Sequence, residues 1–203
     1  MHKLLFLVFS LPLVVNFCGV DDDFEDFNFD RFTGKVSDGI YFSQTDTIWI
    51  RGEASAYLIG QESGDSILEN EPKFFLYPSF ALARLIPPSY RVNAVWAIDE
   101  FEIIVKAGEI ELPQCRSSYI TYYAAYDEEQ KKFLINIGLI PTRPGSYLIS
   151  MKDITFTNEL RNTHLLYNHL FSDDHLRIQW DRCGKIDGIS MEFPEGNHLF
   201  RVR

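Results

Sequence analysis

The stretch Lys132–Ile140 reads KFLINIGLI and decides the fold class. Its strongest apolar residues fall on every second position, which is the period of side chains along one face of a β-strand. These residues form a single row: Phe133, Ile135, Ile137 and Leu139. The row predicts a strand with one face toward a core and the other toward solvent.

The same period of two continues on both sides of this stretch, from about residue 40 to the C-terminus. The charged segment Asp127–Lys131 separates two strand-like runs and therefore predicts the tip of a hairpin. About ten such runs, separated by Pro and Gly turns, indicate an all-β fold, an antiparallel β-sandwich. The turn Pro144–Tyr147 resembles the one that begins a late strand in immunoglobulin-like sandwiches, and this resemblance implies that type. One short helix is predicted near residues 158–171, where either Thr157 or Asn158 could be the cap.

The N-terminal residues predict export. Lys3 precedes an apolar run, Leu4–Val15, which is shorter than the ~20 residues that a membrane-spanning helix needs. A positive start followed by a short apolar run is typical of a secretory signal peptide. We therefore divide the chain into a signal peptide (1–17), an acidic tether (18–38) and a single β-sandwich domain (39–203).

A cysteine follows the apolar run, and an acidic cluster comes soon after it: Cys18, then Asp21, Asp22 and Asp23. This order resembles the lipoprotein signal and acidic export tag of Bacteroidota-type surface lipoproteins. The resemblance implies that Cys18 is lipidated and inserts its acyl chains in the bilayer. It also implies an outer-membrane lipoprotein that faces the cell exterior. Phe17 stands where such signals usually have a small residue, so the alternative is an uncut signal with an incidental cysteine.

Composition narrows the classes of protein to which this chain could belong. The formal net charge of −10 argues against nucleic acid as a partner, because phosphates require a basic face. Aromatic residues make up 15% of the chain. Disordered chains have few aromatic residues, so this content indicates a folded protein. Cys115 and Cys183 remain as an even pair in an oxidising compartment, so they are a disulfide candidate that would stabilise the fold by ~4 kcal/mol. The alternative is two buried thiols.

The sequence contains no motif for nucleotide binding or nucleophilic catalysis, and we assign no catalytic residue, metal or cofactor. The histidines at 164, 169 and 175 are interpreted as polar surface. Three aromatic residues are candidates for a ligand surface, because aromatic rings in strands can stack on sugars. They are Tyr122, Tyr123 and Trp49. The two adjacent tyrosines must point to opposite faces of their strand.

The favoured hypothesis is a non-enzymatic module for binding or for envelope assembly, with an envelope protein or glycan as partner. An enzymatic alternative is a jelly-roll carbohydrate-active enzyme that uses Glu100 and Glu102 as its acid and base. A third hypothesis is a carrier that encloses a small ligand in an internal apolar pocket.

Overall fold

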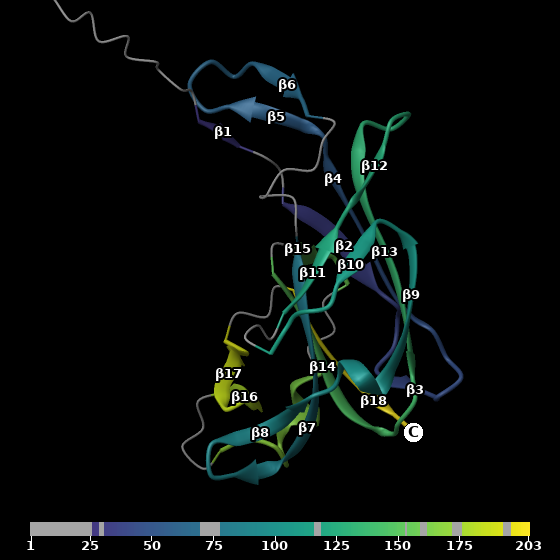
Figure 1. Cartoon of the computed structure of the whole chain (residues 1–203), viewed down its shortest axis with the longest axis vertical. Coiled ribbons are helices and arrows are strands. Elements are labelled where there is room, and N and C mark those ends of the chain that lie inside the picture. The colour runs from purple at the N-terminus through teal and green to yellow at the C-terminus, as the bar shows by residue number, and fades with distance from the viewer. Residues whose placement is uncertain are drawn as a thin grey trace, which may run out of the picture.

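The computed structural model of this chain describes residues 26–28, 31–69, 78–115, 119–152, 154–158, 162–171, 176–192 and 196–203. These residues are predominantly β and form four sheets, shown in Figure 1. Their helical segments are two short 3-10 turns, η2 (Ile98–Glu100) and η3 (Thr163–Leu166). No helix in these ranges has the length and apolar character needed to cross a membrane.

The first large sheet has six strands, with β13 and β4 at its centre. Its order is β12–β13–β4–β2–β15, and β9 also pairs with β13. The bounds are β12 (Ala125–Asp127), β13 (Lys132–Pro141), β4 (Ile48–Ser55), β2 (Phe32–Val36), β15 (Ile154–Phe156) and β9 (Phe101–Ala107). All pairs are antiparallel except that of β15 with β2.

The second large sheet has seven strands. Its order is β10–β11–β7–β14–β18–β3, and β8 also pairs with β7. The bounds are β10 (Glu109–Glu111), β11 (Ile120–Tyr123), β7 (Ser79–Ser89), β14 (Gly145–Lys152), β18 (Asn197–Val202), β3 (Tyr41–Phe42) and β8 (Val92–Trp96). The pair of β18 with β3 is parallel, so both large sheets are mixed.

Two small sheets complete the structure. One joins β1 (Phe27–Asn28), β5 (Tyr57–Gly60) and β6 (Ser66–Leu68), and the other joins β16 (Arg177–Arg182) and β17 (Lys185–Ser190). The three-stranded sheet lies at one end of the long axis of the molecule in Figure 1.

The two large sheets share one core. Phe101 of β9 packs its ring 5.0 Å from that of Tyr147 on β14, and Tyr147 stacks 5.5 Å from Phe200 of β18. The row predicted on β13 is buried in the same cluster, each residue at most 2% exposed. The period of two along Lys132–Ile140 therefore points its apolar row inward, as predicted.

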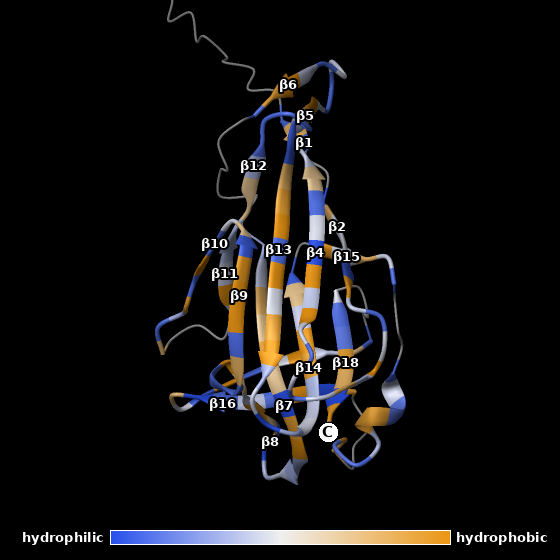
Figure 2. Ribbon diagram, turned by 90° about the vertical axis from the view of Figure 1, so that its right-hand side faces the viewer, coloured by the Kyte–Doolittle hydropathy of each residue, from blue (hydrophilic) through white to orange (hydrophobic). Residues whose placement is uncertain are grey.

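The outer faces of the two large sheets differ. A second apolar cluster, including Trp180 of β16 and Leu166 of η3, covers the outer side of the seven-stranded sheet. In contrast, β4 alternates buried and more exposed residues, and Figure 2 shows bands of opposite hydropathy along it. The outer face of the six-stranded sheet is therefore the open one.

The tether boundary at residue 38 is wrong. Phe32 and Val36 are 2% and 3% exposed, and β2 pairs with β4 inside the six-stranded sheet. Phe27 and Asn28 also form strand β1. The acidic residues of this region led us to predict a solvated tether, but residues 32–36 form an alternating strand. Thr33 and Lys35 take its outward positions.

The predictions of strand number and helix also need correction. The described residues hold 18 strands rather than about ten, because bends divide long runs and several strands have two or three residues. No α-helix occurs at 158 or in 162–171, where only η3 forms. The Asn158 side chain instead bonds the backbone of Val36, and Asn162 donates to the carbonyl of Leu199. Asparagine competes with helix formation through such bonds.

Candidate functional site

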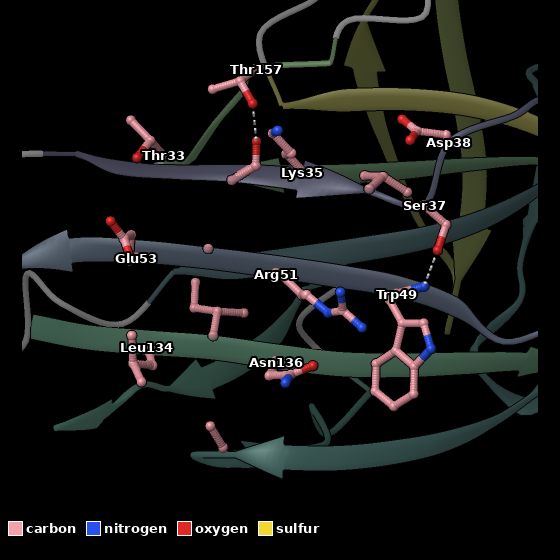
Figure 3. A pocket seen from close by; sticks show the side chains of 15 residues that line it. Thr33, Lys35, Ser37, Asp38, Trp49, Arg51, Glu53, Leu134, Asn136 and Thr157 are labelled. Atoms are coloured by element: carbon pink, nitrogen blue, oxygen red, sulfur yellow. Dashed lines mark hydrogen bonds between the residues drawn. The ribbon is translucent and has the colours of Figure 1, made fainter. Parts of the chain in front are cut away.

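An open groove lies on the outer face of the six-stranded sheet, across β2, β4, β13 and β9 (Figure 3). Its cavity volume is about 570 Å³. The residues that line it are Thr33, Gly34, Lys35, Val36, Ser37, Asp38, Trp49, Arg51, Gly52, Glu53, Ala107, Leu134, Ile135, Asn136 and Thr157. Strand register brings the central side chains together, because Arg51 lies opposite Lys35 on one side and opposite Asn136 on the other.

Trp49 provides the aromatic surface of the groove. Its cross-strand partner is Gly138, and a Cβ atom at that glycine would stand 3.0–3.1 Å from two atoms of the indole. Because glycine has no side chain, the ring can lie against the sheet. Figure 3 shows the indole face-on. The Trp49 amide donates a 2.8 Å hydrogen bond to the Ser37 hydroxyl, which fixes the start of the strand.

Basic side chains surround this ring. The Arg51 guanidinium carbon lies 5.4 Å from the centre of the Trp49 ring, within the range of a cation–π contact. Neither Lys35 nor Arg51 has a carboxylate partner among the described residues. Glu53 is paired with Lys132 at 2.6 Å, so its charge is already balanced.

The groove extends beyond its main cavity. A second cavity of about 340 Å³ shares Thr33 and Glu53 with the first, and it adds Arg31 and Lys132 to the lining. The combined groove therefore has four basic side chains, at 31, 35, 51 and 132, and two acidic ones, at 38 and 53. This local balance is positive, whereas the whole chain carries −10.

Asn136 leaves one polar atom of the groove floor unsatisfied. Its Oδ1 is buried and accepts no hydrogen bond from the described residues. The backbone of Asn136 lies at a β-bulge. Its backbone N–H donates a 3.3 Å hydrogen bond to the hydroxyl of Tyr122, which lies on the core side of the sheet. Burial raises the pKa of Tyr122, while its bond to Asn136 lowers it. A buried acceptor without a donor is costly. A donor on a ligand could satisfy this oxygen if the Asn136 side chain turned toward the groove.

The three predicted ligand-surface residues have different fates. Trp49 lines the groove, but Tyr122 is fully buried in the core, so its assignment to a surface is wrong. Tyr123 is partly exposed on the opposite face, where its hydroxyl bonds the Glu111 carboxylate, and it does not line the groove. The two adjacent tyrosines do point to opposite faces, as the alternation predicts.

The carboxylates of the enzymatic hypothesis do not form a poised pair. Glu100 lies in η2 and accepts two bonds from Arg84 Nε, at 2.8 and 2.9 Å. The Tyr147 hydroxyl lies 2.7 Å from the same carboxylate. Burial, reinforced by Glu100, raises the pKa of Tyr147. Glu102 is exposed on β9, so only one of the two carboxylates belongs to this cluster.

The other predicted sites lie elsewhere. Cys115 and Cys183 form a disulfide with their Cα atoms 5.7 Å apart. Residues 1–17, Cys18, Asp21, Asp22 and Asp23 lie outside the described residues. His164 and His169 belong to the segment around η3, and His175 is also outside the described ranges. Within those ranges, no three His, Cys, Asp or Glu residues gather to hold a metal ion.

Sequence reasoning missed Lys35, Arg51, Asn136 and Gly138. All four occupy outward positions of alternating strands, so the period of two could predict the face of the strand on which each one lies. The register that places them side by side could not be predicted, because it depends on which strands pair. Comparison with protein-family models, curated proteins and solved structures found no match to this chain.

Proposed function

We propose that this protein is a cell-surface lipoprotein whose folded part is a non-enzymatic binding module, with the groove around Trp49 as its ligand site. The observation that carries the proposal is the grouping, in one groove, of an indole that lies against the sheet, two cations without a carboxylate partner among the described residues, and one buried acceptor of the groove floor. Apolar and polar groups that converge in one concave site are characteristic of ligand binding.

For the fold, we propose an immunoglobulin-like β-sandwich. The shared core of the two large sheets supports the sandwich. The Tyr147 hydroxyl lies 2.8 Å from the carbonyl oxygen of Arg143, four residues upstream in the turn before β14. A tyrosine that bonds the backbone upstream of its own strand is a feature of immunoglobulin-like sandwiches.

For the location, we propose that acylated Cys18 anchors the protein to the outer membrane with the domain outside the cell. Residues 19–26 separate Cys18 from strand β1. At full extension they span about 30 Å, so the anchor would keep the three-stranded end of the molecule near the membrane. The acidic tag Asp21–Asp23 lies within this short connection.

The two alternative functions have less support. An acid/base pair needs a free carboxylate in an apolar pocket, whereas Glu100 is held by Arg84 and Tyr147. A carrier needs space between the sheets, whereas Phe101, Tyr147 and Phe200 pack against one another across that space.

Binding to envelope material tests the proposed function. The purified chain from residue 19 is incubated with envelope fractions of its own cells, and the bound fraction is measured by sedimentation. We expect Trp49→Ala to abolish most of this binding. The matched control is Tyr90→Ala, which removes an exposed aromatic residue that does not line the groove. Equal retention of the wild type and Trp49→Ala would refute the groove as the ligand site.

A further inference from the structure

We propose that the ligand of the groove is an acidic saccharide chain, with a sugar ring stacked on Trp49 and a carboxylate held by Arg51 and Lys35. This inference rests on the proposed function, because it takes the groove as the ligand site. It adds the chemical class of the ligand, which follows from three separate features of the groove.

The first feature is the indole of Trp49. The ring lies against Gly138, and Figure 3 shows the indole in the groove with the Arg51 side chain beside it. The ring hydrogens of a sugar form an apolar patch that packs well on an aromatic face, and indoles bury a large area in this way. A single-stranded nucleic acid also stacks on aromatic rings, but it uses several in succession. Among the described residues that line the two cavities, Trp49 is the only aromatic one.

The second feature is the unsatisfied Oδ1 of Asn136. An acceptor can be satisfied only by a donor, and a carboxylate or sulfate group has none at neutral pH. The hydroxyl groups of a sugar are donors. A ligand with hydroxyl or amide donors can satisfy this oxygen once the Asn136 side chain turns toward the groove, whereas a simple anion cannot.

The third feature is the positive charge of the groove. Lys35 and Arg51 face each other across β2 and β4 without acidic partners among the described residues. A protein of charge −10 repels anions in general, so a basic groove on it selects for an anionic ligand at that place. Guanidinium groups bind carboxylates in a planar, two-point manner.

The shape of the groove favours a chain over a single sugar. The two cavities adjoin at Thr33 and Glu53, and together they follow β4 from Trp49 to Ser55. By strand rise this distance is about 20 Å. Arg31 lies at the far end together with the Lys132–Glu53 pair, so a second acidic unit would find a basic group there as well.

Titration calorimetry with three matched polymers tests the inference. The first probe is an oligogalacturonate, which has both sugar rings and carboxylates. The second is its methyl ester, which keeps the rings and loses the charge. The third is polyglutamate, which keeps the charge and has no sugar rings. We expect the oligogalacturonate to bind about tenfold or more tightly than either of the others, with an affinity that falls as salt rises.

Variants locate the binding. We expect Trp49→Ala to weaken oligogalacturonate binding about tenfold, and Lys35→Gln with Arg51→Gln to weaken it similarly and reduce its salt dependence. The controls are Tyr90→Ala and Lys185→Gln, which lie outside both cavities and should bind like the wild type. Circular dichroism verifies that each variant is folded.

Several outcomes would overturn the inference. Equal binding of the methyl ester would mean a neutral saccharide, and equal binding of polyglutamate would mean charge alone. If no oligogalacturonate binds while envelope binding still depends on Trp49, the ligand class is wrong and the proposed function stands. If envelope binding does not depend on Trp49 either, the proposed function fails too.

Discussion

At residue 138 the absence of a side chain leaves the space into which the indole of Trp49 fits. On the core side of the same sheet, Tyr122 bonds the amide of Asn136 at the bulge of β13. The ligand site thus depends on small local features of β13 as much as on the groups that would touch a ligand. A positioning residue of this kind can be tested separately from the binding residues.

Gly138→Ala is expected to weaken ligand binding while leaving the fold intact. The added Cβ would stand 2.9–3.1 Å from Thr47 and Trp49 side-chain atoms, so the indole must tilt away from the sheet. The free energy of unfolding should change by less than about 1 kcal/mol, because alanine is accepted in strands at least as well as glycine. Calorimetry with oligogalacturonate should show about a tenfold loss, as for Trp49→Ala. Binding equal to the wild type would show that the flat position of the ring is unimportant.

His198 is expected to make the fold sensitive to acid. Burial lowers its pKa from 6.5 to about 4. The unfolded chain therefore takes up a proton below pH 6.5 that the folded chain refuses until about pH 4, and stability falls as the pH falls through this window. The loss attributable to His198 should be about 3 kcal/mol between pH 7 and pH 4.

Urea denaturation of the wild type and of His198→Gln at both pH values measures this contribution. Glutamine cannot take up the proton, so the variant should lose less stability on acidification than the wild type. An identical pH dependence of the two proteins would contradict the prediction. Other groups titrate equally in both and cancel in the comparison.

Alternation along a strand predicts some side-chain positions of this protein and not others. Alternation predicted that Tyr122 and Tyr123 point to opposite faces, and they do. It could not predict which one enters the core, since both are tyrosines and the choice depends on the strand partners of β11. Alternation along β4 also places Arg51 on the same face as Trp49. The position of Lys35 beside Arg51 depends instead on the pairing of β2 with β4, which local sequence does not encode.

At the scale of elements, strong alternation was the most reliable guide. Strand β13 was predicted with its inward row, and the hairpin tip at Asp127–Lys131 lies between β12 and β13 as expected. The preceding run was predicted as one strand, but it divides near Ala124, so β11 joins the seven-stranded sheet and β12 the six-stranded one. Strand β2, which is central to the site, was not predicted, because the residues around it are polar and acidic.

The hairpin of β16 and β17 is attached to the domain by the disulfide between Cys115 and Cys183. The bridge spans 68 residues, which by chain entropy corresponds to about 4 kcal/mol. Arg182 reinforces it, with its guanidinium carbon 4.2 Å from the centre of the Trp96 ring. The double variant Cys115→Ser, Cys183→Ser should lose stability by up to this amount in urea denaturation.

Ligand binding provides the control for that experiment. Neither cysteine lines the groove, so the folded double variant should bind oligogalacturonate like the wild type under conditions that keep it folded. A stability unchanged from that of the oxidised wild type would contradict the role given to the bridge.

At the scale of the whole molecule, the two large sheets have different surroundings. The seven-stranded sheet is covered on its outer side by β16 and η3, whereas the six-stranded sheet presents its outer face and the groove. The end with β1 is the one joined to the proposed anchor. A short tether would hold this end near the membrane while the groove, on the side of the molecule, remains accessible to glycans.

The anchor predicts the mass of the mature protein. Protein extracted from membranes of its own cells should begin at Cys18 and carry a diacylglycerol and one further acyl chain, which together suffice for stable anchoring. Intact-mass spectrometry of the wild type and of Cys18→Ser measures this, and the variant should lack the lipid mass. A wild-type species that retains Met1, or that has an unmodified Cys18, would contradict the anchor.

The most direct test of the central claim follows the three tryptophan indole N–H signals by nuclear magnetic resonance during titration with oligogalacturonate. Trp49 lies in the groove, Trp96 packs against Arg182, and Trp180 is fully buried, so each reports on a different part of the molecule. We expect the Trp49 signal to shift progressively and to saturate, while those of Trp96 and Trp180 stay in place. A Trp49 signal that does not move at saturating ligand, or that moves no more than the other two, would contradict the central claim.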